Sequence, residues 1–368
     1  MPHELAVVGM NYREASTALR AKAAAVDRDE NGPSGALLTG KFATGIVRIE
    51  TCSRSEWVIS AHDGKWAAEL FRAALLSRLQ ISPEPRLHKK CGSAAIEYLL
   101  RVAIGLDAVN EGEAAVGKQV LRAFTESHAQ GHTDRILNLA WNEVGKLLHH
   151  KRRVLPARPH IGIQKLVLEQ LLEQSMKREA VVCIFGAGQI GRAVFATLQQ
   201  HSFAHVHLFS RATQNEFLQM APQAAAVIVA SGAPDAWLTV PKAQLSGCES
   251  LGVCIDVGSP NQVISAEGRV YFTLDHLLAR PGCLLPENEY ERLLALIETH
   301  AEILRQRMLQ PDDGKQLQAM AAERKNFLHS KLPQVLAEVS SPDLQKSIRK
   351  EIHHLTHALL KRAQRGER

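Results

Sequence analysis

The sequence predicts a multidomain protein of the α/β and α classes: an N-terminal α+β domain, a Rossmann-type domain, a long helix and a C-terminal helical domain. Three observations support this prediction. Strand-like and helix-like segments alternate over residues 5–79, a glycine-rich turn follows an apolar strand near residue 185, and helical spacing continues after Pro286. The 368 residues are enough for two or three domains of ~100–200 residues each.

The N-terminal segments follow a β–α–β–β–α order. Residues 5–11 (LAVVGMN) are typical of a buried strand, and an Ala-rich helix is expected near residues 15–27. Two further strands, GIVRIE and EWVIS, flank the turn TCSRS, and a helix follows over WAAELFRAALLSRL. This order predicts a small α+β sandwich with Cys52 at a strand end. Helical spacing then extends from Ser93 to about Leu155.

Short apolar strands that end in polar or glycine-containing turns fill the central region. They are AVVCIF, HVHLFSR, AAVIVASGAP and LGVCIDVGSP, and their alternation with helical segments predicts an open parallel sheet wrapped by helices. Past Pro286, one long helix is predicted, followed by amphipathic segments of a kind often used for oligomerisation. We expect domains at residues 1–155, 156–285 and 311–368, with the long helix at 286–310.

Composition and charge narrow the classes of function. No stretch approaches the ~18 apolar residues of a membrane span and no signal-peptide pattern is seen, so we expect a cytoplasmic protein without membrane contact. The six cysteines form no CxxC pair, and His149 and His150 have no acid or cysteine at ligand spacing, so no metal site is predicted. Residues 145–168 carry six lysines and arginines, Lys151 among them, and no acid. Together with a basic C-terminal region, this run indicates either a phosphate-rich partner or solvated faces.

The turn GAGQIG, residues 186–191, is the strongest local signal for a ligand. Gly186 permits a tight turn, Gly188 lets the backbone approach a pyrophosphate, and Gly191 lets strand and helix pack closely. Because the turn stands between a strand and a helix, it predicts a dinucleotide site. Its expected cofactor-binding residues are Gly186, Ala187, Gly188, Gln189, Ile190 and Gly191.

The end of the next strand indicates which dinucleotide binds. Sites selective for NAD usually carry an acid about 20 residues further on. HLFSRAT places Ser210, Arg211 and Thr213 in this region, without an acid. A hydroxyl and a guanidinium suit a 2′-phosphate, so we predict NADPH; the alternative is that Arg211 merely faces solvent.

Successive motifs resemble the glutamyl-tRNA reductase family over almost the whole chain. ETCSRSEW is similar to that family's S-T-C-N-R-T-E motif, and AAIEYLLRVAIGLDAVNEGE is similar to its helix containing V-A-S-G-L-D-S. VVGMNYREA at the start, and GAGQIGR, SGAP, IDVGSP and LTHALLKR later, follow the family's order. The resemblance implies NADPH-dependent reduction of glutamyl-tRNA to glutamate-1-semialdehyde, the first step towards 5-aminolevulinate, porphyrins and haem.

The resemblance also implies roles for individual residues. Cys52 would attack the glutamyl ester and form a thioester, which NADPH then reduces. Thiolate is the reactive form of cysteine, and Arg54 would stabilise it or bind the carboxylate of the substrate. The other substrate-binding candidates are Thr51, Ser53, Ser55, Tyr98, Ala108, Glu113 and Gln119. A helix-starting carboxylate explains Glu113 equally well.

The implied partners are glutamyl-tRNA, a second copy of the chain in a V-shaped homodimer, and glutamate-1-semialdehyde aminomutase. The implied domains are catalytic, NADPH-binding and dimerisation domains, joined by the long helix. The basic stretches would contact tRNA phosphates, which position a nucleic acid without reading its sequence.

The chain departs from the family pattern at several positions. Tyr98 stands where the family has a histidine, Ala108 where it has a serine and Ala115 where it has a glutamine; Tyr12 and Ser53 also differ from the family residues. Tyrosine donates a hydrogen bond but does not readily titrate near neutral pH, so the polar wall of the substrate pocket is expected to differ.

Three interpretations follow from these departures. A divergent reductase would keep Cys52 and Arg54 and rebuild the pocket, with His88 approaching from the preceding segment and Asp107 bracing local structure. The alternative is a non-catalytic or substrate-shifted paralogue that acts as an aminoacyl-tRNA-binding or regulatory protein. A general NADP-dependent oxidoreductase of small carbonyl compounds is the third, and it leaves the basic stretches and the TCSR turn unexplained.

Overall fold

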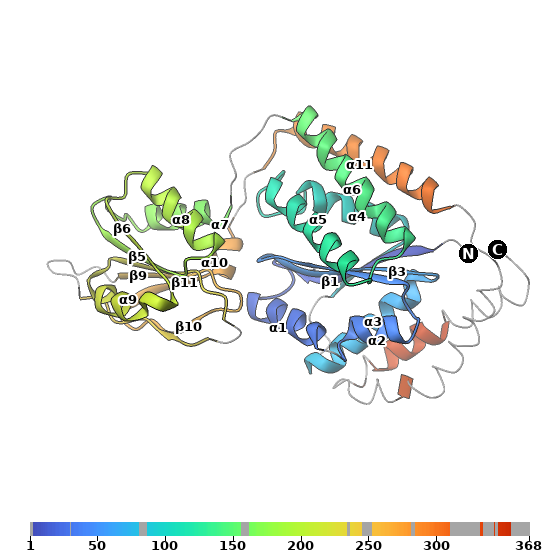
Figure 1. Cartoon of the computed structure of the whole chain (residues 1–368), viewed down its shortest axis with the longest axis horizontal. Coiled ribbons are helices and arrows are strands. Elements are labelled where there is room, and N and C mark those ends of the chain that lie inside the picture. Colours follow the sequence, from blue (N-terminus) through green and yellow to red (C-terminus); the bar gives the residue numbers. More distant parts are fainter. Residues whose placement is uncertain are drawn as a thin grey trace, which may run out of the picture. The chain divides into compact units, whose positions relative to one another are not determined.

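The computed structural model describes residues 3–29, 31–80, 87–155, 162–233, 236–244, 252–280, 284–309, 332–333, 342 and 345–354. The chain divides into two compact units (Figure 1). The first comprises Met1–Ala15, Lys22–Arg158 and Leu284–Arg368, and the second comprises Ser16–Ala21 and Pro159–Cys283. The predicted multidomain α/β architecture is confirmed, whereas the predicted domain boundaries stay predictions.

The first unit is built on a four-stranded antiparallel sheet. Its strand order is β2 (Gly45–Glu50), β3 (Arg54–Ala61), β1 (Glu4–Asn11) and β4 (His88–Cys91). Strand β1 therefore lies between β3 and β4, and the hairpin β2–β3 carries the TCSR turn at its tip. On one side of the sheet lie α2 (Pro33–Thr39) and α3 (Gly64–Leu79), as Figure 1 shows.

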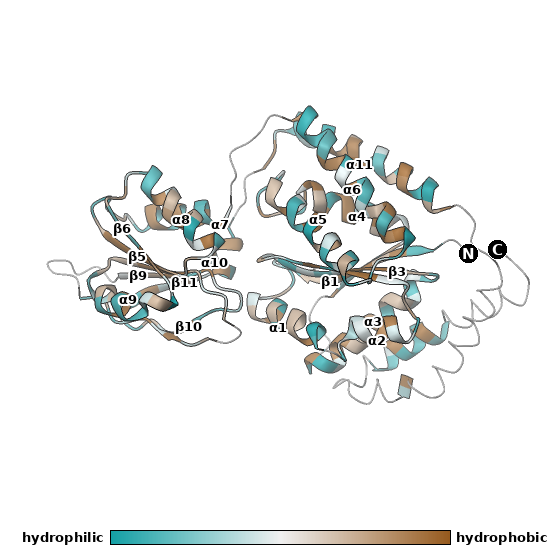
Figure 2. Cartoon of the chain, viewed as in Figure 1, coloured by the Kyte–Doolittle hydropathy of each residue, from teal (hydrophilic) through white to brown (hydrophobic). Residues whose placement is uncertain are grey.

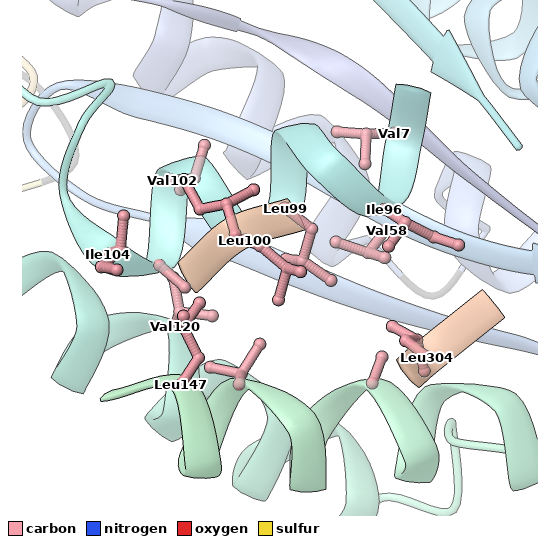
Figure 3. Packing of buried hydrophobic residues seen from close by; sticks show 14 of the residues in the cluster. Val7, Val58, Ile96, Leu99, Leu100, Val102, Ile104, Val120, Leu147 and Leu304 are labelled. Carbon is pink, nitrogen blue, oxygen red and sulfur yellow. The ribbon is translucent and has the colours of Figure 1, made fainter. Parts of the chain in front are cut away.

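Every residue of β3 is buried, so this strand has no solvent-facing side although it contains both polar and apolar residues. Successive side chains of a strand point to opposite faces. Trp57 packs against Phe71 of α3, with ring centroids 5.0 Å apart, and its indole N–H donates to Asp27 (2.6 Å). Val58 points the other way, into a core cluster with α4 (Ser93–Ile104), shown in Figure 3.

Four helices cover that second face. Residues from α4, α5 (Ala114–Ala129), α6 (Arg135–Val154) and α11 (Glu287–Met308) join Val7 and Val58 in one hydrophobic cluster (Figure 3). Helix α11 confirms the long helix predicted from the sequence, and Figure 2 shows apolar and polar residues alternating along it. It packs against α4 and α6 within this unit. Its buried apolar residues recur at helical spacing: Leu293, Ile297, Ala301, Leu304 and Met308.

The second unit confirms the predicted parallel sheet. Its strands lie in the order β11-β9-β7-β5-β6, and all neighbouring pairs are parallel. The strand order reverses between β5 and β7, and in such sheets this switch point is where ligands bind. Helices α7 and α8 cover one face and α9 covers the other (Figure 1). The bounds are β5 (Val181–Phe185), β6 (His205–Phe209), β7 (Ala226–Val229), β9 (Gly252–Asp256), β11 (Arg269–Thr273), α7 (Ile163–Glu173), α8 (Gln189–Gln200) and α9 (Gln214–Met220).

The remaining described elements are short or terminal. They are α1 (Thr17–Arg28), α10 (Leu274–Leu278), the 3-10 helices η1 (Arg211–Thr213) and η2 (Ala221–Gln223), and a parallel pair β8 (Leu238–Thr239) and β10 (Val263–Ser265). Residues 345–354 are helical, while most of the helical domain predicted at 311–368 lies outside the described residues. Among the helices that the structure describes, none combines the length and the hydropathy of a membrane span.

Candidate functional site

Cys52 lies in the tight turn between β2 and β3. The backbone N–H of Thr51 donates to the carbonyl oxygen of Arg54 (2.9 Å), which closes the turn. The hydroxyl of Thr51 accepts from the N–H groups of Ser53 (3.1 Å) and Arg54 (3.2 Å), so the turn is fixed by its own side chains. Cys52 is half-buried and is not in a disulfide. Cys52 is therefore less buried than the cysteines of the parallel sheet, Cys183 and Cys254.

Arg54, two residues further on, is completely buried beneath this turn. Its Nη1 donates to Glu56 (2.9 Å) and lies 3.3 Å from Asp107 Oδ2, and its Nη2 donates to the carbonyl oxygen of Asp107 (2.5 Å). Burial alone would lower the pKa of Arg54, but electrostatic interactions with Glu56, Tyr98 and Asp107 raise it above its ordinary value. The guanidinium therefore keeps its positive charge, and its position is fixed by Glu56 and Asp107 within the domain.

Tyr98 reaches the same carboxylates from helix α4. Its hydroxyl donates to Glu56 Oε1 (2.7 Å) and lies 3.4 Å from Asp107 Oδ2. Burial, followed by the charge of Glu56, raises the pKa of Tyr98, so the phenol stays protonated and acts as a donor. Asp107 braces this cluster, as the sequence predicted, because it holds Arg54 with both its backbone and its side chain.

The end of strand β1 closes the cluster from another side. The N–H of Tyr12 donates to the carbonyl oxygen of Ser53 (2.8 Å), and Arg13 pairs with Asp107 (2.9 Å). Glu14 accepts from Nδ1 of His88 (2.7 Å). The approach of His88 was suggested by sequence reasoning. The contacts of Arg13 with Asp107 and of Glu14 with His88 were not predicted from the sequence, because they depend on how the segments around β1 fold together.

The loop between α4 and α5 links this cluster to helix α6. Lys151 Nζ donates to the carbonyl oxygens of Ile104 (2.7 Å) and Gly112 (2.8 Å), at the two ends of the loop. Burial lowers the pKa of Lys151 to about 8, against the opposing charge of Glu113. Burial also raises the pKa of Glu113 to about 7, although the positive charges of Lys151 and Arg54 act to lower it. Lys151 is therefore a buried support of the loop and not a surface member of the basic stretch.

Other substrate-binding candidates lie elsewhere in the first unit. Ala108 is buried in the hydrophobic cluster, and Gln119 is exposed on α5. Ser55 is buried, and strand alternation turns its side chain to the opposite face of the sheet from Arg54 and Glu56. Glu56 was not singled out from the sequence, although it lies two residues after Arg54, at the spacing that puts both on one face.

The glycine-rich turn lies between β5 and α8 and makes close backbone contacts at two of its glycines. Gly186 has a φ of +118°, and a Cβ there would lie 2.4 Å from the carbonyl oxygen of Ala230 at the end of β7. A Cβ on Gly191 would lie 1.8 Å from the carbonyl oxygen of Gly186. Gly188, by contrast, would place its Cβ in open space, with nothing within 4 Å. Two glycines are thus required by packing at the switch point, and the third leaves the turn accessible.

Ser210, Arg211 and Thr213 follow β6, next to β5 in the sheet. The hydroxyl of Thr213 accepts from the N–H of Ser210 (2.9 Å), which orders the start of η1. Arg211 is exposed at this position, so both predicted uses of its guanidinium, phosphate binding and solvation, are compatible with its place. Among the described parts of the chain, no group of three or more His, Cys, Asp and Glu side chains is arranged to hold a metal ion.

Comparisons with known proteins point to one family. Residues 8–151 match the family model of the glutamyl-tRNA(Glu) reductase N-terminal domain. The glutamyl-tRNA reductase of Listeria innocua serovar 6a is 26% identical over 214 residues, which are 56% of this chain and 49% of that protein. The enzyme of the same name from Streptococcus sanguinis is 28% identical over 215 residues, covering 56% and 51%.

The chain is also similar to a solved structure of a glutamyl-tRNA reductase. Glutamyl-tRNA reductase from Methanopyrus kandleri is 19% identical, with 96% of this chain and 93% of that chain covered and a TM-score of 0.42. The chain spans about half the length of the curated relatives it matches.

The first unit, with its cysteine-bearing hairpin and buried polar cluster, is an α+β domain of the class found at the N-terminus of glutamyl-tRNA reductases. It is followed in the same chain by a parallel α/β sheet. Residues 8–151 thus match the glutamyl-tRNA reductase N-terminal domain, and the chain is similar to glutamyl-tRNA reductases over 56% of its length.

Proposed function

We propose that the protein reduces glutamyl-tRNA to glutamate-1-semialdehyde with NADPH, through a thioester on Cys52, as a step of tetrapyrrole synthesis. The observation that carries this proposal is the placement of Cys52: half-buried, at the tip of a hairpin whose conformation is fixed by Thr51. A nucleophile on a rigid turn keeps its orientation towards an acyl carbon, and this geometry is worth several kcal/mol in rate.

The first step is acyl transfer to sulfur. The Cys52 thiolate attacks the carbonyl carbon of the glutamyl ester, a C–S bond forms, and the C–O bond to the tRNA ribose breaks as its oxygen takes up a proton. Arg54 contributes a permanent positive charge next to this turn, held in place by Glu56 and Asp107. Its donors are engaged by Glu56 and Asp107, so Arg54 supports the turn from within the domain.

The second step is reduction of the acyl group. The turn 186–191 would hold the pyrophosphate of NADPH: Gly186 and Gly191 shape it by packing, and Gly188 leaves room above the backbone. Ser210, Arg211 and Thr213 would hold the 2′-phosphate, since Arg211 is exposed and no acid precedes it in HLFSR. NADPH, when bound, supplies the hydride that turns the acyl group into an aldehyde and releases the thiol.

The partners follow from this reaction. Glutamyl-tRNA is the proposed substrate, and exposed Arg152 and Arg153 on α6 are suited to contact its phosphates. A homodimer, an interaction with glutamate-1-semialdehyde aminomutase and a cytoplasmic location are proposed from the family alone.

The direct experiment is to incubate the protein with charged glutamyl-tRNA and NADPH beside a Cys52→Ser variant. The proposal expects glutamate-1-semialdehyde from the parent protein and none from the variant. Stable tRNA binding without NADPH consumption would favour a non-catalytic, aminoacyl-tRNA-binding paralogue instead. Growth of a cell that lacks its own reductase, rescued by this chain, would separate a reductase from a general oxidoreductase of carbonyl compounds.

A further inference from the structure

Glu56, Gly9 and His88 form a row across three strands of the first unit. Gly9 of β1 pairs with Glu56 of β3 on one side and with His88 of β4 on the other. Residues paired directly across an antiparallel sheet point to the same face, so Glu56 and His88 share the face that Tyr98 covers. A Cβ at Gly9 would lie 2.7 Å from Cγ of Glu56, so only glycine lets the two side chains meet above it. His88 Nε2 lies 3.6 Å from Glu56 Oε1.

The imidazole of His88 is held in one orientation. Its Nδ1 lies 2.7 Å from a carboxylate oxygen of Glu14, and that oxygen also accepts from the N–H of Asn11 (3.0 Å). A carboxylate only accepts, so Nδ1 carries the proton of this hydrogen bond. In the neutral ring the other nitrogen, Nε2, is then an acceptor. The ring centroids of His88 and Tyr98 are 5.1 Å apart, which packs the imidazole against α4.

Two acceptors in this row lack a hydrogen-bond partner among the described residues: Nε2 of His88 and Oε2 of Glu56. Their side chains are only 10% and 1% exposed. Leaving such atoms unpaired costs about 1–3 kcal/mol each, so a ligand that donates to both would bind with a gain of that order. The nearby charges favour a cation, because three carboxylates, Glu14, Glu56 and Asp107, face two guanidiniums, Arg13 and Arg54.

We propose that His88, positioned by Glu14, contacts the substrate, and that its Nε2 together with Glu56 Oε2 accepts hydrogen bonds from the α-ammonium group of the aminoacyl ester. This inference rests on the proposed function and adds a substrate contact to it. Glu56 and His88 lie on the same face of the sheet as Arg54, which follows the Cys52 turn at the start of β3.

Two substitutions separate the contact from a structural role. The amide of His88→Asn reaches the place of Nδ1 and keeps the bond to Glu14, but it leaves nothing at Nε2. The amide of His88→Gln extends to the place of Nε2 and offers an oxygen there. The proposal expects kcat/KM for glutamyl-tRNA to fall roughly tenfold or more in His88→Asn and to be largely kept in His88→Gln. The reverse order of the two variants would overturn it, because it would mean that only the tie to Glu14 matters.

The substrate supplies a matching test. Acetylating the α-amino group of glutamyl-tRNA removes the ammonium, and the parent protein is expected to lose at least as much kcat/KM as His88→Asn does. In His88→Asn the acetylated and free substrates should differ much less than in the parent. Equal sensitivity to acetylation in both proteins would contradict the contact.

One measurement does not depend on how the His88 variants fold. In the Cys52→Ala protein, which cannot be acylated, the imidazole ¹⁵N resonance of His88 Nε2 should shift on addition of glutamyl-tRNA and not with uncharged tRNA. An unmoved resonance at saturating glutamyl-tRNA would overturn the inference while leaving the proposed function intact. A parent protein that neither forms an acyl adduct nor makes semialdehyde would remove the proposed function, and the inference with it.

Discussion

Substituting Gly188 and Gly191 with alanine separates the packing of the glycine-rich turn from its use as a cofactor site. In Gly191→Ala the new methyl group would lie 1.8 Å from the carbonyl oxygen of Gly186. Because the obstacle is backbone, strand β5 and helix α8 must move apart, at a cost of about 1–3 kcal/mol or more. We therefore expect lower stability and weaker NADPH binding together.

Gly188→Ala is the matched change at a position with space. A Cβ at Gly188 meets nothing within 4 Å, and its backbone (φ −76°, ψ −169°) is one that alanine adopts. Alanine leaves the unfolded chain fewer backbone conformations than glycine does, which should raise the free energy of unfolding by ~0.4–1 kcal/mol. The same methyl group would occupy the place where a pyrophosphate approaches the backbone, so NADPH affinity should fall roughly tenfold or more, about 1.4 kcal/mol.

Urea unfolding monitored by circular dichroism and NADPH binding monitored by calorimetry give the two quantities. The reasoning predicts opposite signs for Gly188→Ala: a higher unfolding midpoint and a weaker cofactor complex. Unchanged NADPH affinity in Gly188→Ala would refute the idea that a dinucleotide passes over this turn. Unchanged stability in Gly191→Ala would refute the packing argument.

Three further predictions concern charge and hydrogen bonding. Arg211→Ala should weaken NADPH binding without affecting NADH, measured by titration of both nucleotides; an equal loss for both would contradict a role in 2′-phosphate binding. Tyr98→Phe removes the donor to Glu56 (2.7 Å) and should cost about 1–3 kcal/mol of unfolding free energy in urea, whereas an unchanged midpoint would contradict it. Glu113, with its pKa raised to about 7 from 4.5, keeps its proton in the folded state where the unfolded state has lost it. Its contribution to stability should fall by up to about 1.4 kcal/mol per pH unit between these values, and Glu113→Gln should remove that slope in unfolding curves measured across this range; a slope that persists would count against the shift.

Local signals in the sequence predicted the parts of the fold that local geometry decides. The glycine-rich turn was identified with its strand and helix because the pattern is local, and Gly191 meets the carbonyl oxygen of Gly186 five residues before it. The close approach of Gly186 to Ala230 at the end of β7 depends on the order of strands in the sheet. The long helix α11 was predicted from its apolar spacing. What it packs against, α4 and α6, was not predicted, since helical spacing gives the buried face and not the partner.

The polar cluster was predicted only in part, for a different physical reason. Arg54 and Tyr98 were identified from motifs, but the meeting of Glu56 and His88 depends on the register of β1 with two strands that lie on either side of it. A shift of one residue would turn these side chains to the other face. Lys151 was counted with a basic surface stretch, and its burial against two carbonyl oxygens follows from the closure of the 105–113 loop.

Intact-mass spectrometry of the protein after incubation with glutamyl-tRNA, without NADPH, tests the central claim most directly. The account predicts a mass increase of one glutamyl group that hydroxylamine removes, absent in Cys52→Ala and kept in Cys91→Ala. Cys91 is the matched control, because it too is half-buried and burial raises the pKa of its thiol to about 11. An adduct that survives Cys52→Ala, or no adduct on a protein that still makes semialdehyde, would contradict the account.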